Sequence, residues 1–121
     1  PGVNFNLGVC QFGNARHLID SGGILALATD YNPGSSPTIS LPLMMAIACR
    51  FQKLLPAEAL NACTINAAAA LNLSEKVGSL ETGKFADFLI LDAVDYRALM
   101  IEFGHNFVAQ VYLGGEQKWT Q

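Results

Sequence analysis

Asp30 is the residue of this sequence that is best placed for chemistry, because it ends an apolar run and opens a polar loop. The run Ile24–Thr29 follows two glycines and is typical of a strand buried on both faces of a parallel sheet. The loop Thr29–Pro37 contains two prolines, a glycine and several polar side chains, which predicts a rigid segment. α/β barrels present catalytic groups from the C-terminal ends of their strands. The alternative is that Asp30 only caps the turn or the next helix, and spacing alone leaves both interpretations open.

The elements around this loop alternate as in an α/β fold. Apolar residues at helical spacing predict a short helix over Asn14–Ser21, and Gly22-Gly23 supplies its stop. A helix followed by a buried strand is typical of α/β proteins, in which helices and strands alternate along the chain. The other expectations for this half are a loop at Pro1–Gly13 and helices at Ile39–Leu54 and Pro56–Leu71. Pro42 fits the first of these helices only in its first turn, where backbone N–H groups lack an intrahelical partner.

The composition changes after Asn72, and the last fifty residues or so are predicted to be mainly β. The segment Val108–Trp119 indicates a hairpin that turns at Gly114-Gly115. Shorter strands are expected within Val77–Leu80 and Phe85–Asp92. We therefore place a domain boundary between residues 73 and 74.

The overall composition excludes several classes of function. The chain of 121 residues is 51% hydrophobic and only 14% charged, with a net charge of −3. The few basic residues are scattered, so neither nucleic acid nor an anionic membrane is an expected partner. The apolar stretches are too short to span a bilayer. The three cysteines, Cys10, Cys49 and Cys63, form no Cys-x-x-Cys and are expected to be reduced, buried side chains of a cytoplasmic protein.

Three segments carry a family resemblance that covers essentially the whole chain. The loop Thr29-Asp30-Tyr31-Asn32-Pro33-Gly34-Ser35-Ser36 resembles the last barrel strand and following loop of the imidazolonepropionase family, within the metal-dependent amidohydrolase superfamily. The helix that begins at Pro56 and the segment Gly78–Asp87 resemble the post-barrel helix of that family and the superfamily's return into a small β-domain. The resemblance implies an α/β fold made of two parts. Residues 1–73 would be the C-terminal segment of a metal-dependent (β/α)8 (TIM) barrel, and residues 74–121 part of a small β-sandwich domain.

The resemblance also implies roles for four residues. Asp30 would bind the catalytic metal, zinc or iron, and accept a proton from the attacking water, since an ionised carboxylate can do both. Asn32, Gly34 and Ser35 would bind the substrate, 4-imidazolone-5-propanoate, or the product, N-formimidoyl-L-glutamate. They offer an amide, a backbone without a Cβ and a hydroxyl, which together suit a small anion. The implied reaction is the metal-dependent hydrolysis of the cyclic amide in histidine degradation, in a cytoplasmic homodimer.

The rest of the expected metal site is missing from the sequence. The superfamily holds its metal mostly with histidines, whereas this sequence has only His17 and His105, which form no pair and are expected to have structural or surface roles. One carboxylate alone does not hold zinc, so we expect the chain by itself to be a catalytically inactive fragment. The low charge agrees, because cutting a barrel exposes apolar surface, here expected beside Ile24–Thr29. The alternatives are another amidohydrolase, such as a guanine deaminase or a different cyclic-amide hydrolase, and a non-catalytic interaction domain.

Overall fold

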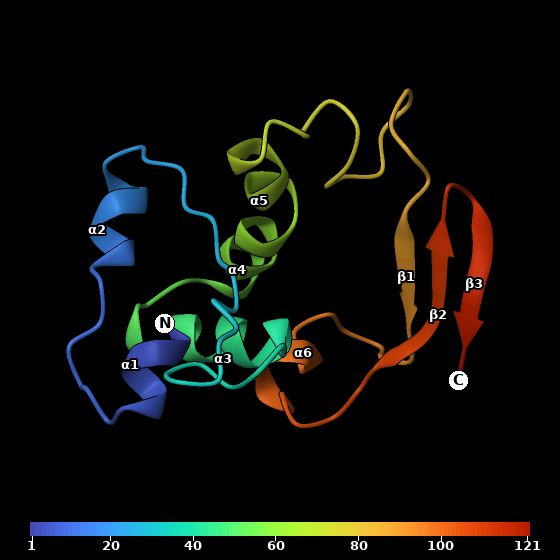
Figure 1. Ribbon diagram of the computed structural model, residues 1–121. Coiled ribbons are helices and arrows are strands. Elements are labelled where there is room, and N and C mark those ends of the chain that lie inside the picture. The colour runs from blue at the N-terminus through green and yellow to red at the C-terminus, as the bar shows by residue number, and fades with distance from the viewer.

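Helices build the first part of the molecule. The computed structural model describes residues 1–121, and Figure 1 shows its helices gathered beside a separate small sheet. The helices of this first part are α1 (Gly2–Asn6), α2 (Ala15–Asp20), α3 (Leu41–Phe51), α4 (Pro56–Cys63) and α5 (Ile65–Ala70). Of the predicted helices, the first is confirmed as α2 and the second, shorter at both ends, as α3.

Helix α3 forms the centre of the hydrophobic core. Pro42 lies in its first turn, as predicted, and the Ser40 hydroxyl accepts a hydrogen bond from the Leu43 N–H at 3.2 Å, which caps the helix. The five consecutive residues from Met44 to Ala48 are all buried. Two of them, Met45 and Ala48, share one hydrophobic cluster with the small buried side chains of Ala59 and Ala62 in α4. Further along the chain, α6 (Ala98–Ile101) adds Leu99 and Met100 to the same core.

The last part of the chain forms a three-stranded antiparallel sheet. Its strands, in the order β1-β2-β3, are β1 (Phe88–Leu91), β2 (Val108–Leu113) and β3 (Glu116–Thr120). Phe88 pairs with Tyr112, and their rings stack with centroids 4.5 Å apart. The predicted hairpin is confirmed, because Gly114 and Gly115 both adopt positive φ (60° and 81°) in the two-residue turn between β2 and β3. Glycine adopts these angles without steric cost.

Several predicted elements are wrong. Ile24–Thr29 is extended but pairs with no strand, since its backbone is bonded to helices: the Leu27 N–H donates to the Ala62 carbonyl at 2.9 Å. Pro1–Gly13 is not all loop, because it contains α1, which contacts α3. Val77–Leu80 is not a strand. The predicted helix from Pro56 to Leu71 is broken in two at Thr64, whose hydroxyl donates to the Leu60 carbonyl at 2.8 Å, a local bond known to bend helices.

Gly78 joins the end of the helical part to the segment that leads to the sheet. Its φ is +96°, and a Cβ at this position would lie 2.8 Å from the Cβ of Ala68 and 2.9 Å from the Cα of Ile65. Both neighbours belong to α5, and the second contact is with backbone. Only glycine fits here, because both the φ and the available space exclude a side chain.

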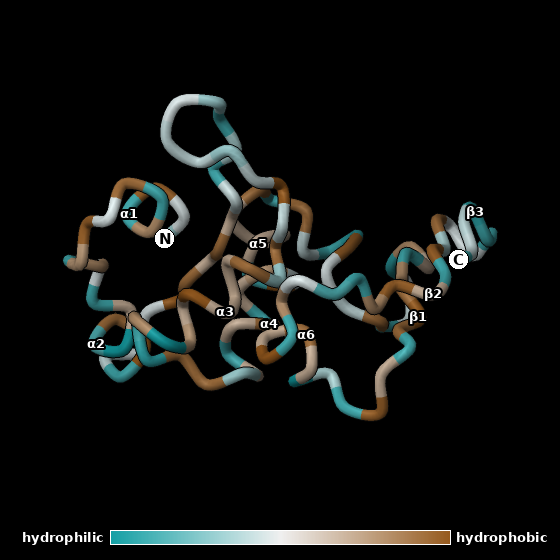
Figure 2. The backbone as a smooth tube through the Cα atoms, turned by 90° about the horizontal axis from the view of Figure 1, so that it is seen from below, coloured by the Kyte–Doolittle hydropathy of each residue, from teal (hydrophilic) through white to brown (hydrophobic).

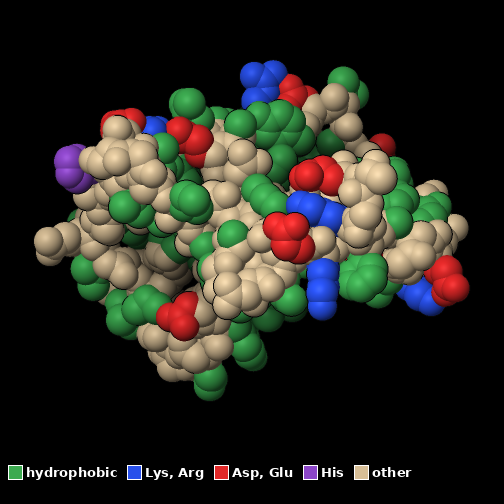
Figure 3. Space-filling view, turned by 90° about the horizontal axis from the view of Figure 1, so that it is seen from above, with side chains coloured by type: hydrophobic (Ala, Val, Ile, Leu, Met, Phe, Trp, Pro, Cys, Tyr) green, Lys and Arg blue, Asp and Glu red, His purple; other side chains and the backbone are tan.

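Much of the surface is apolar. Only 16 of the 121 residues are buried, and Ile24, in the segment before Asp30, is 76% exposed, which confirms the expected apolar exposure there. Figure 2 shows hydrophobic stretches along α3 and along β1 and β2. On the face in Figure 3, acidic and basic side chains are interspersed among hydrophobic ones. All three cysteines are free, but the expectation that they are buried is wrong, since Cys10 is exposed and Cys49 and Cys63 are half-buried. None of the helices has the length and hydrophobicity that a membrane span requires.

Candidate functional site

The Asp30 side chain lies at the start of a tight loop on the molecular surface. Asp30 is exposed and has a positive φ of 49°. Few residues other than glycine adopt this left-handed conformation, although aspartate adopts it more readily than most. The loop closes on itself at Ser36, six residues after Asp30. The Asn32 N–H donates to the Ser36 carbonyl at 3.1 Å, and the Ser36 N–H donates to the Asn32 carbonyl at 3.3 Å. The predicted rigidity of this segment therefore has a structural basis in paired backbone groups.

The Asn32 side chain organises the inside of the loop. Its Oδ1 accepts three hydrogen bonds, from the Gly34 N–H at 3.1 Å, the Ser35 N–H at 2.7 Å and the Ser35 hydroxyl at 3.1 Å. Its Nδ2 donates to the carbonyl of Asp30 at 2.9 Å. The structure thus brings together all four residues that the sequence singled out. It leaves one amide hydrogen of Asn32 free, because an amide nitrogen carries two.

Ser36 anchors the loop to the body of the molecule, and sequence reasoning missed it. Its side chain is completely buried, and its hydroxyl donates to the carbonyl of Thr29 at 2.7 Å. It lies against Gly2 of α1, where a Cβ would come within 2.6 Å of the Ser36 Oγ. The adjacent Ser35 and Ser36 are indistinguishable by type, so the sequence held no signal for which of them faces inward.

The segment before Asp30 is held by the helices on its other side. Besides the bond from Leu27 to Ala62, the Asn66 Nδ2 donates to the carbonyl of Leu25 at 2.9 Å. Asn66 reaches this carbonyl from the first turn of α5, directly after the break at Thr64. The position of Asp30 is therefore set by hydrogen bonds from α4 and α5 upstream and from its own loop downstream.

An ion pair fastens α2 to the start of α4. Arg16 binds Glu58 through two hydrogen bonds, Nη1 to Oε2 at 2.8 Å and Nη2 to Oε1 at 3.0 Å. Glu58 also accepts the Leu55 N–H at 2.7 Å. The guanidinium and this N–H stabilise the ionised carboxylate and lower the pKa of Glu58. The hydrogen bonds that Arg16 donates to Glu58 and to Asp20 raise the pKa of Arg16. This pair is structural, and it lies outside the Asp30 loop.

The residues of this chain do not by themselves fit a catalytic metal. No three His, Cys, Asp or Glu side chains gather into a group that could hold one. His17 is exposed on α2, and His105, also exposed, packs edge-on against Phe107 with centroids 4.4 Å apart. A catalytic zinc site uses three protein ligands, whereas the loop offers the single carboxylate of Asp30.

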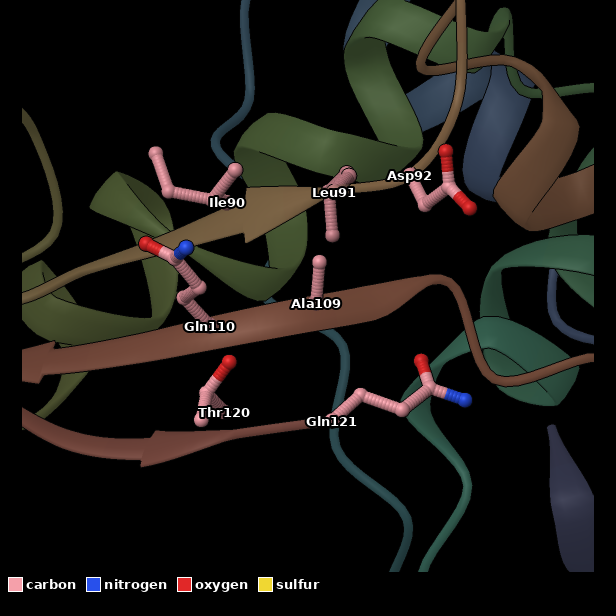
Figure 4. Close-up of a pocket in the computed structure, with 7 residues that line it drawn as sticks. All are labelled: Ile90, Leu91, Asp92, Ala109, Gln110, Thr120 and Gln121. Atoms are coloured by element: carbon pink, nitrogen blue, oxygen red, sulfur yellow. The ribbon is translucent and has the colours of Figure 1, made fainter.

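One depression of the molecule lies on the sheet, and no residue of the Asp30 loop lines it. It has a volume of about 500 Å³ and runs across the three strands, with residues of each contributing to its lining (Figure 4). Its polar groups are those of Asp92, Gln110, Thr120 and Gln121. A smaller cavity of about 130 Å³ lies between α2, α4 and the segment before Asp30. Neither is lined by Asp30, whose side chain is exposed.

Comparison with known proteins identifies similar sequences over nearly the whole chain. Residues 11–118 match the family model described as "Amidohydrolase family". The chain is 54% identical over 116 residues to the imidazolonepropionase of Chloroflexus aggregans and 53% identical over 117 residues to that of Deinococcus radiodurans. These matches cover 96% and 97% of this chain but only 27% and 29% of the relatives. The chain therefore spans little more than a quarter of the length of the curated relatives it matches.

Solved structures resemble the fold. An adenosine deaminase from Xanthomonas campestris with bound zinc superimposes on the whole chain with a TM-score of 0.84 at 25% identity, and the chain covers 31% of that protein. The guanine deaminase of E. coli matches the whole chain with a TM-score of 0.79 at 20% identity, and 33% of it is covered. The arrangement of helices and sheet described above therefore recurs as about a third of each of these two larger proteins.

Proposed function

The chain belongs to the amidohydrolase family, and from this membership we propose that it is the part of an imidazolonepropionase that presents Asp30 to the substrate. The observation that supports this proposal is the self-closed loop from Thr29 to Ser36, which holds an exposed carboxylate in a left-handed conformation. The identity of about one half to imidazolonepropionases selects this activity among amidohydrolases. The likeness to guanine deaminase, at 20% identity, concerns the fold alone.

The proposed reaction is the hydrolytic opening of 4-imidazolone-5-propanoate to N-formimidoyl-L-glutamate. The oxygen of water adds to the ring carbonyl carbon, and Asp30 accepts the proton that this water loses. The carbon–nitrogen bond of the cyclic amide then breaks, and the proton passes from Asp30 to the departing ring nitrogen. An exposed carboxylate suits this task, because substrate and water can both reach it.

The substrate's propionate would bind on the side of the loop formed by Asn32, Gly34 and Ser35. The free amide hydrogen of Asn32 and the Ser35 hydroxyl, which can rotate away from Asn32, are the available donors. Gly34 is exposed and has no Cβ, so a ligand can approach its backbone. A single loop would therefore place the ring carbonyl and the anionic tail of the substrate relative to each other.

We assign the metal of the complete enzyme, zinc or iron, to ligands that lie mostly outside this chain. Amidohydrolases generally depend on a divalent metal, and the Xanthomonas structure contains zinc. Asp30 would contribute one oxygen ligand. The chain alone is therefore expected to be inactive. The complete enzyme is proposed to be a cytoplasmic homodimer that acts on a small molecule and binds neither nucleic acid nor membrane.

A chimeric enzyme tests the proposal. In the imidazolonepropionase of Chloroflexus aggregans, the 116 matched residues would be replaced by this chain. Ring opening would be monitored as a decrease in the absorbance of the substrate. We expect turnover, and we expect Asp30→Asn, which keeps the size of the side chain, to lower kcat by about 10²- to 10⁴-fold. Asp92→Asn is the matched control, because Asp92 is exposed and forms no ion pair. A folded chimera that opens no ring, or one that tolerates Asp30→Asn, contradicts the proposal.

A further inference from the structure

The two peptide groups on either side of the Asp30 Cα are each held by one side chain. The carbonyl of Thr29 belongs to the peptide group before Asp30, and it accepts the Ser36 hydroxyl at 2.7 Å. The carbonyl of Asp30 belongs to the peptide group after it, and it accepts the Asn32 Nδ2 at 2.9 Å. The planes of these two groups define φ and ψ of Asp30. The two hydrogen bonds together therefore set the direction in which the Asp30 side chain leaves the backbone.

This restraint maintains a conformation that is unfavourable in isolation. A φ of 49° is disfavoured for a residue with a Cβ, and such residues persist only where the surroundings over-determine them. Asn32 is part of the loop and half-buried, whereas Ser36 is completely buried between the loop, α1 and α3. The Ser36 hydroxyl therefore transmits the rigid packing of the helices to the peptide group before Asp30.

From this geometry we propose that Ser36 is a positioning residue, which acts on the reaction through the backbone of Asp30 and never touches the substrate. The inference rests on the proposed function only in naming Asp30 as the reacting carboxylate. Since Ser36 has no exposed surface, it cannot contribute to substrate binding. Its removal should misdirect Asp30 and leave the groups that bind the propionate in place.

The matched pair Ser36→Ala and Ser40→Ala tests this proposal. Both remove one hydroxyl that makes one hydrogen bond to the backbone, but Ser40 caps α3 and makes no bond to the Asp30 loop. In the chimera we expect Ser36→Ala to lower kcat at least tenfold with KM within about twofold, since small misplacements of reacting groups are costly. Ser40→Ala should leave kcat of the folded protein within twofold. A rise in KM alone, or an unchanged kcat in Ser36→Ala, overturns the proposal.

Amide hydrogen exchange in the 121-residue chain gives a second readout that needs no activity. In Ser36→Ala, the amides of Asn32, Ser35 and Ser36, which are bonded within the loop, should exchange at least tenfold faster than in Ser40→Ala. Equal exchange in the two variants overturns the proposal. If the unmodified chimera folds but opens no ring, the proposed function fails, whereas the exchange result still decides whether Ser36 fixes the loop.

A second variant covers the case in which Ser36→Ala does not fold. Gly2→Ala keeps the serine hydroxyl but places a methyl group 2.6 Å from it, which forces the hydroxyl away from Thr29 or α1 away from the loop. The same loss of kcat with little change in KM is expected. An unchanged kcat in Gly2→Ala, together with unchanged exchange of the loop amides, overturns the proposal.

Discussion

The helical part and the sheet of this molecule are held together by different interactions. All buried hydrophobic side chains lie in the helices or the segments between elements, and no residue of β1, β2 or β3 is buried. The sheet is held by backbone pairing and by half-exposed contacts such as the stack of Phe88 on Tyr112. The Asp30 loop is anchored to the helical part. The geometry of the candidate site therefore depends on core packing. The sheet contacts that core through the half-buried Leu91 of β1, and the rest of the sheet can change with little effect on the site.

Truncation of the core should have the largest effect. Met44 is completely buried in α3, so Met44→Ala leaves a cavity and should lower the free energy of unfolding by about 2–5 kcal/mol. Urea denaturation, monitored by circular dichroism, measures this change in the free energy of unfolding. Because Met44 also lies against Gly2, the loop amides should exchange faster. A loss below about 1 kcal/mol would mean that the helical part is no better packed than the sheet.

Thiol reactivity probes the same packing without a substitution. Burial raises the pKa of Cys63 to about 11, from an ordinary value of 9.0. At pH 8 Cys63 therefore has about a hundredfold less thiolate, the reactive form, than a thiol with the ordinary pKa. Cys10 is exposed to the reagent. In a time course of iodoacetamide labelling read by mass spectrometry, Cys10 should react first and Cys63 about a hundredfold more slowly. Similar rates would show that the helical part opens readily.

The ion pair between α2 and α4 should make the stability of the helical part depend on pH. The pKa of Glu58 is lower in the folded chain than its ordinary value of 4.5, mainly through Arg16. Its stabilising effect is therefore complete above the pKa of the unfolded chain and is lost as the pH falls through the folded-state value. Glu58→Gln should be less stable than the original chain at pH 7, and the difference should shrink below pH 4.5.

Urea denaturation curves recorded at pH 7 and at a pH below 4.5 check this prediction. Glu75→Gln is the control, because Glu75 is exposed and forms no ion pair; its difference from the original chain should be small at both. A stability difference for Glu58→Gln that grows as the pH falls would show that the carboxylate is destabilised in the folded chain.

A polar substitution on the sheet should have the smallest effect. Leu113 is 52% exposed at the end of β2, and Leu113→Ser should change the free energy of unfolding by about 0.5 kcal/mol or less. In the chimera, kcat should be unchanged. A loss comparable to that of Met44→Ala would remove the contrast between the two regions.

The sequence predicted the elements that depend on local chemistry. The two-glycine hairpin, the helix with Pro42 in its first turn and the polar loop after Thr29 each follow from residues adjacent in the chain. The failures depend on distant contacts. Ile24–Thr29 looks like a buried strand, but its Leu27 N–H and Leu25 carbonyl bind Ala62 and Asn66, about forty residues away.

The same contrast between local chemistry and distant contacts explains why only part of the candidate site was predicted. Asp30 and Asn32 follow from a recognisable motif, whereas the role of Ser36 depends on the close approach of α1, which no local pattern indicates. The proposed domain boundary at residue 73 stays a prediction. Helix α6, from the second half of the chain, packs on α3 and accepts a hydrogen bond from Arg50 at the Met100 carbonyl, 2.9 Å away.

The close contact at Gly78 has a consequence for how this chain tolerates mutation. A single methyl group there would act as a wedge between α5 and the segment that leads to the sheet, because the nearest atoms include backbone that cannot rotate aside. Substitutions in the exposed strand β3 should be accepted widely. In a library of all single substitutions, we therefore expect position 78, which lies far from the reacting carboxylate in sequence, to be among the least permissive.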